Sequence, residues 1–274
     1  MKITEYPSIT EFTDDQVFLL DGDNGTKQAN VITALLGIMH LTAVELHRTI
    51  FRGKNLGTAI TTEQIAAIQA GTFDDLWLGD YWVINGYNWR IVDFDYWYGQ
   101  GDTACTSHHI VIMPDSYLYT AQMNTSNTTE GGYVGSAMYT SNLANAKTIV
   151  NSAFGSSYVL SHREYLTNAV TSGYPSAGAW CDSTVELPNE IMMYGCPVFL
   201  PAGTGSVVVN RYTVCKTQLA LMRAVPYFIN PSRQMQWLRD VVSLASFAYV
   251  NSNGNTGYGN ASYSYGVRPV FAVG

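Results

Sequence analysis

The sequence is poor in charged residues. Asp, Glu, Lys and Arg make up 13% of its 274 residues, the formal net charge is -7, and Lys and Arg form no run. Proteins that neutralise the phosphates of DNA or RNA need clustered basic side chains. The sequence therefore predicts no nucleic-acid partner.

Long apolar runs are also missing. The longest, VITALLGIMHLTAV at Val31 to Val44, is shorter than the ~20 residues of a membrane-spanning helix and contains polar residues. The opening MKITEYPSITEF has one Lys and no apolar segment, so we expect no secretory signal peptide there. Membrane insertion is not expected.

Motifs of catalysis and metal binding are absent as well. The sequence has no HExxH or GxSxG motif, and GTGS at 203–206 lacks the Lys of a phosphate-binding loop. Ser161, His162 and one of several Asp residues could be combined into a catalytic triad, but no local motif supports this combination. His108 and His109 lie on a predicted strand, where neighbouring side chains point to opposite faces. We expect structural histidines, no catalytic residue, no metal and no cofactor.

The four cysteines, Cys105, Cys181, Cys196 and Cys215, form no CxxC pair. Four cysteines allow three disulfide pairings, and sequence cannot choose among them. We interpret them as small buried residues, with disulfides or metal ligation as the alternative.

The N-terminal part predicts a hairpin followed by a helix. Residues 16–32 read as strand, turn and strand, with Asn24-Gly25 as a strong turn signal. An amphipathic helix after Ile32 would pack on its copy in another subunit. A compact helix is expected over 61–71.

The remainder predicts an α+β fold, with short strands of an irregular antiparallel sheet around two helices. Asn85-Gly86 is the expected turn of a hairpin within 76–98. The aromatic run there is interpreted as core, with a sugar site as the alternative; it comprises Trp82, Tyr87, Trp89, Phe94, Tyr96, Trp97 and Tyr98. Further expected elements are a strand at 108–114, helices at 142–154 and 161–170, and strands in EIMMYGCPVFL, SVVVNRYTV, WLRDVV, FAYV and VRPVFAV.

The stretch YVNSNGNTGYGNASYSY, from Tyr249 to Tyr265, has an unusual composition. Fourteen of its seventeen residues are Asn, Ser, Gly or Tyr, and none is charged. Antibody paratopes favour these residues, because Tyr gives rigid contact area and the others give adaptable hydrogen bonds. Disorder is the less favoured alternative, since four Tyr are present. Adenine-directed change of Asn codons would also yield Tyr, Ser and Gly.

The C-terminal segment RQMQWLRDVVSLASFAYVNSNGNTGYGNASYSYGVRPVFAV resembles the variable region of proteins that retroelements diversify in phages and prophages. Upstream segments resemble the scaffold of phage-borne members, among them GDYWVINGYNWRIVDFDYW, GGYVGSAMYTSNL and WCDSTVELPNEIMMYG. One departure is Gln236 before Trp237, where the family often has a second Trp.

The resemblance implies a C-type lectin-like domain over 73–274, with a variable region at about 237–268. Residues 1–72 would form an attachment or oligomerisation region, with a soft boundary near 45–72. An enzyme on a related fold would need Cys181 and Cys196 together in a pocket, and the sequence shows no counterpart of a reactive pair. The ligand-binding positions implied are Ser246, Tyr249, Asn251, Asn253, Asn255, Gly257, Tyr258, Gly259, Asn260, Tyr263 and Tyr265.

The function implied is receptor binding at a phage tail-fibre tip. The partners would be a bacterial surface protein or glycan and other tail proteins, the protein would be a homotrimer, and it would reside in the virion. The alternative is a static carbohydrate- or ligand-binding protein of the same fold, encoded by a bacterium or prophage.

Overall fold

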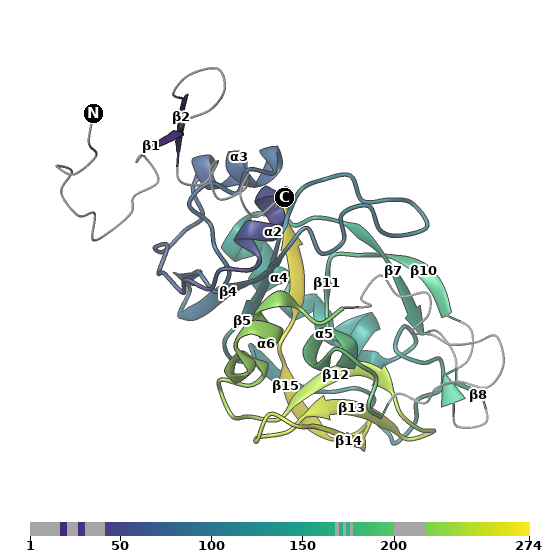
Figure 1. Cartoon of the computed structure of the whole chain (residues 1–274). Coiled ribbons are helices and arrows are strands. Elements are labelled where there is room, and N and C mark those ends of the chain that lie inside the picture. Colours follow the sequence, from purple (N-terminus) through teal and green to yellow (C-terminus); the bar gives the residue numbers. More distant parts are fainter. Residues whose placement is uncertain are drawn as a thin grey trace. The chain divides into compact units, whose positions relative to one another are not determined.

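The computed structural model describes residues 17–20, 27–30, 42–167, 170–171, 174–175, 178–199 and 217–274 (Figure 1). The chain divides into two units, Met1–Leu46 and His47–Gly274. This division lies at the start of the interval 45–72 in which a soft boundary was expected, and it places residues 47–72 in the second unit. The role of the first region in attachment stays a prediction.

In the first unit, β1 (Val17–Leu20) pairs antiparallel with β2 (Lys27–Asn30). The two strands of the expected hairpin are therefore confirmed. The turn at Asn24-Gly25 and the helix expected after Ile32 lie outside the described residues. A short helix, α2 (Ala43–His47), crosses the division between the units.

The second unit is built on two five-stranded sheets. The strands of the first are β3 (Tyr81–Ile84), β4 (Tyr87–Phe94), β5 (Ile110–Pro114), β11 (Val185–Glu186) and β16 (Val270–Val273). Their order is β11-β16-β5-β4-β3, and every pairing is antiparallel. Asn85 and Gly86, with φ of 51° and 81°, form the tight turn between β3 and β4, as the sequence predicted.

The strands of the second sheet are β6 (Tyr119–Gln122), β12 (Gln236–Val241), β13 (Ser246–Val250), β14 (Thr256–Asn260) and β15 (Ser264–Val267). Their order is β14-β13-β12-β15-β6. The pair β12–β15 is parallel, whereas an antiparallel sheet was expected. In Figure 1, β12, β13 and β14 lie at the bottom of the second unit.

Two helices match their sequence signals. In α3 (Thr62–Ala70), Thr61 and Gln64 form a capping box and Gly71 ends the helix in the left-handed conformation. In α4 (Leu143–Phe154), the buried residues recur at helical spacing and end with Phe154. A π-helical turn, η1 (Met138–Asn142), precedes α4.

The helix expected over 161–170 is wrong. Residues His162–Thr167 form β7, which pairs antiparallel with β10 (Gly178–Ser183). His162, Glu164 and Leu166 are buried and alternate with less buried neighbours, which is the period of a strand. The alternation was missed because two of the inward residues are polar.

The prediction of a strand in EIMMYGCPVFL is also wrong for the first part of this segment. Glu190–Tyr194 form helix α5, in which the Asn189 side chain caps the N–H of Met192 and Gly195 ends the helix. These end signals outweigh the strand-like composition. SVVVNRYTV lies outside the described residues.

Four further short elements lie in the described ranges: β8 (Val170–Thr171), β9 (Tyr174–Pro175), α6 (Ala220–Ala224) and the 3-10 helix η3 (Pro226–Ile229). The fold is α+β, as the sequence predicted. None of the helices in the described ranges is both long and apolar enough to span a bilayer.

The core confirms the interpretation of the aromatic run. Trp82 and Trp89 are fully buried and meet Phe154 of α4 edge to face, at 6.0 and 5.6 Å between ring centroids. Phe94, Tyr96 and Trp97 are buried too. Tyr87 is half-buried and Tyr98 is exposed, so five of the seven rings belong to the core and the sugar-site alternative stays a prediction for the other two.

The cysteine interpretation fails for the three cysteines that the structure describes. Cys105 and Cys181 are half-buried, Cys196 is exposed, and all three are free thiols. Cys215 lies outside the described residues.

Candidate ligand-binding face

One face of the second sheet gathers several of the positions that the sequence singled out. Tyr249 on β13 pairs with Trp237 on β12 and with Gly257 on β14. Directly paired residues point to the same side of a sheet, so these three share one face. Tyr265 of β15 joins them, with its ring centroid 4.6 Å from that of Trp237 and 4.9 Å from that of Tyr249. We call Tyr249, Gly257, Gly259, Tyr263 and Tyr265 the tyrosine face.

Two glycines make room for the rings. A Cβ at Gly257 would lie 2.9 Å from Cζ of Tyr249, and a Cβ at Gly259 would lie 3.1 Å from Cε2 of Tyr265. Each ring therefore lies across a glycine of the edge strand β14. Any larger residue there would have to push a ring away from the sheet.

The three tyrosine rings differ in how much of their surface is exposed and so accessible to a ligand. Tyr263 is 48% exposed and lies 5.9 Å from Tyr265 between ring centroids, whereas Tyr249 and Tyr265 are half-buried. Partial burial, followed by the nearby hydroxyls of Tyr249 and Tyr263, raises the pKa of Tyr265. Its hydroxyl therefore stays neutral at pH 7 and can both donate and accept.

The loop between β13 and β14 is held by its own first residue. Oδ1 of Asn251 accepts from the N–H groups of Asn253 and Asn255, at 2.8 and 3.1 Å. The Asn251 carbonyl also accepts from Nδ2 of Asn230 at 2.6 Å. Asn251 is thus engaged in structure, while the side chains of Asn253 and Asn255 are exposed.

Three predicted positions lie on the opposite side of the sheet. Ser246 pairs with Asn260 and Ala248 pairs with Tyr258, one residue out of phase with Tyr249. Ser246 is buried and donates to Oδ1 of Asn260 at 3.4 Å. Tyr258 is 57% exposed and meets Phe199 at 5.2 Å between ring centroids. The eleven positions therefore divide between two faces and a loop.

A hollow of about 350 Å³ adjoins the tyrosine face. Tyr265 and Ser264 line it on one side, and Tyr117 and Arg233 are among the residues that complete it. Sequence reasoning missed Arg233, because no motif marks it. In the structure its φ of 53° is a backbone conformation that is uncommon outside glycine. Such a hollow can receive a side chain or sugar that projects from a bound surface.

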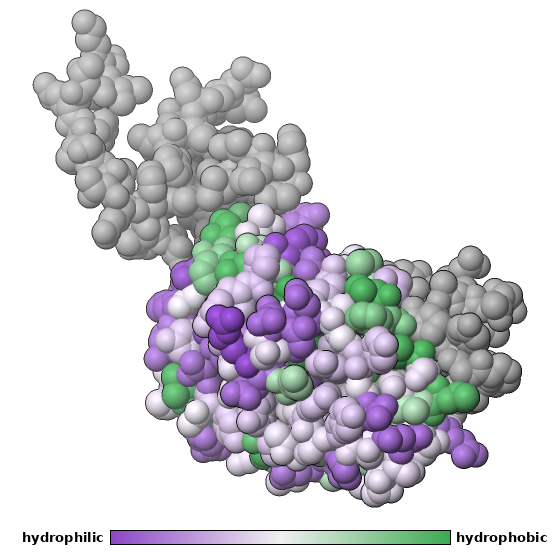
Figure 2. Space-filling view, turned by 90° about the horizontal axis from the view of Figure 1, so that it is seen from below, coloured by the Kyte–Doolittle hydropathy of each residue, from purple (hydrophilic) through white to green (hydrophobic). Residues whose placement is uncertain are grey.

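Figure 2 shows the second unit from the side on which β12–β14 lie in Figure 1. Purple and white residues cover most of this side, and green areas are small and separate. A broad apolar patch, which would mark a permanent protein interface, is not seen on this side.

The two adjacent histidines have structural partners. The Trp97 N–H donates to Nε2 of His109 at 3.1 Å, and Nδ1 of His109 donates to the Ser107 carbonyl at 2.9 Å. Burial lowers the pKa of His109 to about 4, so the ring is neutral at pH 7. His108 lies 2.6 Å from Oδ2 of Asp95 and stacks on Tyr98. Among the described residues no group of three His, Cys, Asp or Glu could hold a metal ion.

No protein-family model, no curated protein and no solved structure matches the chain.

Proposed function

We propose that this chain is a receptor-binding protein at the tip of a phage tail fibre. It attaches without covalent chemistry to a protein or glycan on a bacterial surface. The ligand-binding surface is the tyrosine face together with the exposed side chains of Asn253 and Asn255. The scaffold is a C-type lectin-like fold, and the protein acts outside the host cell as part of the virion.

The observation that carries this proposal is the arrangement of Tyr249 and Tyr265 over Gly257 and Gly259. The rings are fixed by packing on Trp237, whose Nε1 donates to the Ala121 carbonyl at 2.9 Å. A rigid ring loses little entropy when it binds, so pre-ordered tyrosines favour tight contact. A trimer would add avidity to a weak single-site affinity.

The residue types on this face support a surface under diversification. Tyr, Gly, Ser and Asn at these positions are what adenine-directed change of Asn codons produces. The proposal predicts a second copy of the segment encoding Trp237 to Arg268, close to the gene and beside a reverse transcriptase. The copy should differ from the gene only at adenines. A neighbourhood without such a copy would leave binding as the function but remove diversification from the proposal.

Adsorption tests the proposal directly. Phage that carry Tyr249→Ala with Tyr265→Ala should lose at least ~90% of adsorption to host cells, since anchor residues of this kind each contribute ~2 kcal/mol or more. Tyr158→Ala is the matched control, because Tyr158 is a partly exposed tyrosine in a loop outside the second sheet. Unchanged adsorption of the double variant, with its melting temperature preserved, would overturn the assignment of the tyrosine face.

A further inference from the structure

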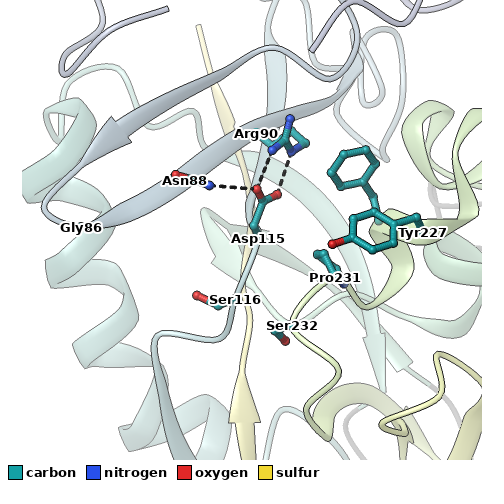
Figure 3. Close-up of a pocket in the computed structure, with 9 residues that line it drawn as sticks. Gly86, Asn88, Arg90, Asp115, Ser116, Tyr227, Pro231 and Ser232 are labelled. Carbon is teal, nitrogen blue, oxygen red and sulfur yellow. Dashed lines mark hydrogen bonds and ion pairs between the residues drawn. The ribbon is translucent and has the colours of Figure 1, made fainter. Parts of the chain in front are cut away.

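A second cavity shares no lining residue with the tyrosine face or with the hollow beside it. It has a volume of about 440 Å³ and is built from three separate parts of the chain: residues 86–90, residues 115–116 and residues 227–232 (Figure 3). Pockets that hold small ligands are commonly ~300–1,000 Å³. The cavity is thus large enough for a single sugar ring.

One side of the cavity carries a fixed carboxylate. Asp115 accepts two hydrogen bonds from Arg90, at 2.7 Å from Nε and 2.5 Å from Nη2, and a third from Nδ2 of Asn88 at 3.3 Å. Figure 3 shows these bonds converging on the carboxylate. A carboxylate has about four lone-pair positions, so Asp115 retains capacity for a hydroxyl of a ligand.

The guanidinium of Arg90 is itself held in place. Its Cζ lies 4.5 Å from the ring centroid of Tyr81 and 4.4 Å from that of Phe228. Its Nη1 donates to the Gly79 carbonyl. Because Arg90 cannot turn, the orientation of Asp115 is fixed before any ligand arrives.

The other side of the cavity is an aromatic ring at the rim. Tyr227 is 66% exposed, and its ring meets Phe228 edge to face at 5.3 Å between centroids. The hydroxyls of Ser116 and Ser232 lie below it in Figure 3. A flat apolar ring facing hydroxyl, amide and carboxylate groups suits a sugar, which has apolar C–H faces and a hydroxyl edge.

Arg268 joins the two sides. This fully buried residue donates from Nε to the Pro114 carbonyl at 2.6 Å and from Nη2 to the Phe228 carbonyl at 3.1 Å. Pro114 precedes Asp115 and Phe228 follows Tyr227, so one side chain sets the width of the cavity. A cavity that is formed in advance loses less free energy on binding than one that must be ordered.

The charges around the cavity are all engaged within the protein. The Asp115 carboxylate forms an ion pair with Arg90, and the buried guanidinium of Arg268 is held by three carbonyl groups, so the lining offers hydrogen bonds rather than a free charge. We propose that this cavity binds a neutral polyhydroxylated ligand of monosaccharide size, such as the terminal hexose or N-acetylhexosamine of a glycan. This proposal does not depend on the tyrosine face or on its diversification.

Saturation-transfer NMR on the full chain tests the proposal. The probes are methyl glycosides of the common hexoses and N-acetylhexosamines at millimolar concentration. At least one should receive saturation from the protein. Tyr227→Ala should weaken its affinity by about fivefold or more, because a stacked aromatic ring is lost. Asn88→Ala should weaken it as well, because an amide group that lines the cavity is lost.

Tyr258→Ala is the matched control for Tyr227→Ala. Both residues are exposed tyrosines, but Tyr258 lies on β14 and not in this cavity. Affinity for the glycoside should be unchanged in Tyr258→Ala and in the double variant Tyr249→Ala with Tyr265→Ala. The proposal is overturned if no glycoside of the panel receives saturation, or if Tyr227→Ala and Asn88→Ala, folded by circular dichroism, bind like the unchanged protein.

The two proposals can be refuted independently of each other. Loss of adsorption without glycoside binding supports the tyrosine face alone, and glycoside binding without an effect of Tyr249 and Tyr265 on adsorption supports the cavity alone.

Discussion

Tyr249 and Tyr265 lie side by side across the second sheet, with ring centroids 4.9 Å apart and planes inclined at 52°. They come from β13 and β15, which are separated in the sheet by β12. Trp237 of β12 lies against both rings. The sheet therefore joins positions from different strands into one surface.

Gly257→Ala tests how this surface is supported. The new Cβ would come 2.9 Å from the far end of the Tyr249 ring, and the ring can turn outward more easily than the strand can move. The free energy of unfolding should change by less than about 1 kcal/mol, because alanine also removes the entropy cost of glycine. Tyr249 should become more exposed and adsorption should fall.

The measurements for Gly257→Ala are urea denaturation, adsorption and the reactivity of Tyr249 toward iodination. Gly259→Ala is the comparison, since its Cβ would meet Tyr265 at the longer distance of 3.1 Å. A larger effect from Gly259→Ala than from Gly257→Ala would contradict the packing described for the two rings.

Asn251→Ala should destabilise the loop between β13 and β14. It removes the oxygen that accepts from the N–H groups of Asn253 and Asn255. Because this loop is exposed and water can replace the bonds in part, the expected loss is about 1 kcal/mol of unfolding free energy. Urea denaturation measures it. Asn253→Ala, whose side chain is exposed, should have no measurable effect, and equal losses in both variants would refute the role of Asn251.

Arg268→Lys should destabilise the protein strongly. The guanidinium donates to the carbonyls of Pro114, Phe228 and Ile229, and a lysine ammonium cannot reach all three with the same geometry. Burial lowers the pKa of Arg268 to about 10, so the group is charged at pH 7. We expect a loss of about 3 kcal/mol in chemical denaturation, because two buried carbonyls lose their donor. A loss below ~1 kcal/mol would show that the carbonyls find other partners.

The raised pKa of Asp240 predicts that the stability of the protein depends on pH. Burial, followed by the negative charge of Glu190, raises the pKa of Asp240 to about 7, although its Oδ2 accepts from the Glu190 N–H at 2.6 Å. In the unfolded chain an Asp has a pKa of ~3.9. Between these two values the folded state binds the proton more tightly, so raising the pH lowers the free energy of unfolding. Above about pH 7 this contribution becomes constant.

Asp240→Asn isolates that contribution, because the amide keeps an oxygen for the Glu190 N–H but does not titrate. Relative to this variant, the unchanged protein should lose about 2–4 kcal/mol of stability between pH 4 and pH 7. Asp93 and Glu186 also have pKa values raised by burial, but both proteins contain them, so they cancel in the comparison. Parallel stability curves for the two proteins would disprove the assignment.

Local signals determined which elements could be predicted. Asn85-Gly86 specifies a tight turn and Thr61 with Gln64 specifies a helix start, because these preferences depend on backbone geometry within a few residues. The strand at His162–Thr167 could not be predicted in this way. Its inward residues His162 and Glu164 are polar, and Glu164 accepts from Trp97 and Arg239, which are distant in sequence.

The candidate site was predictable in composition but not in arrangement. The sequence singles out the stretch from Tyr249 to Tyr265, yet only the strand register shows that Tyr258 points away from Tyr249. The cavity near Asp115 could not be foreseen. Its part at 227–232 lies more than a hundred residues from the other two, and Arg268 brings them together through carbonyl groups that any residue possesses.

The glycine strand beneath the two rings restricts how this surface can evolve. A bulky residue at position 257 or 259 and an aromatic ring at 249 or 265 compete for the same volume, so these positions cannot be varied as independent choices. Among natural or synthetic variants, a large residue at 249 should occur with a small residue at 257, and a large residue at 265 with a small residue at 259. A library in which these positions are randomised independently would therefore contain many variants that cannot pack. Randomising 249 together with 257, so that one of the two stays small, would yield a larger fraction of folded variants.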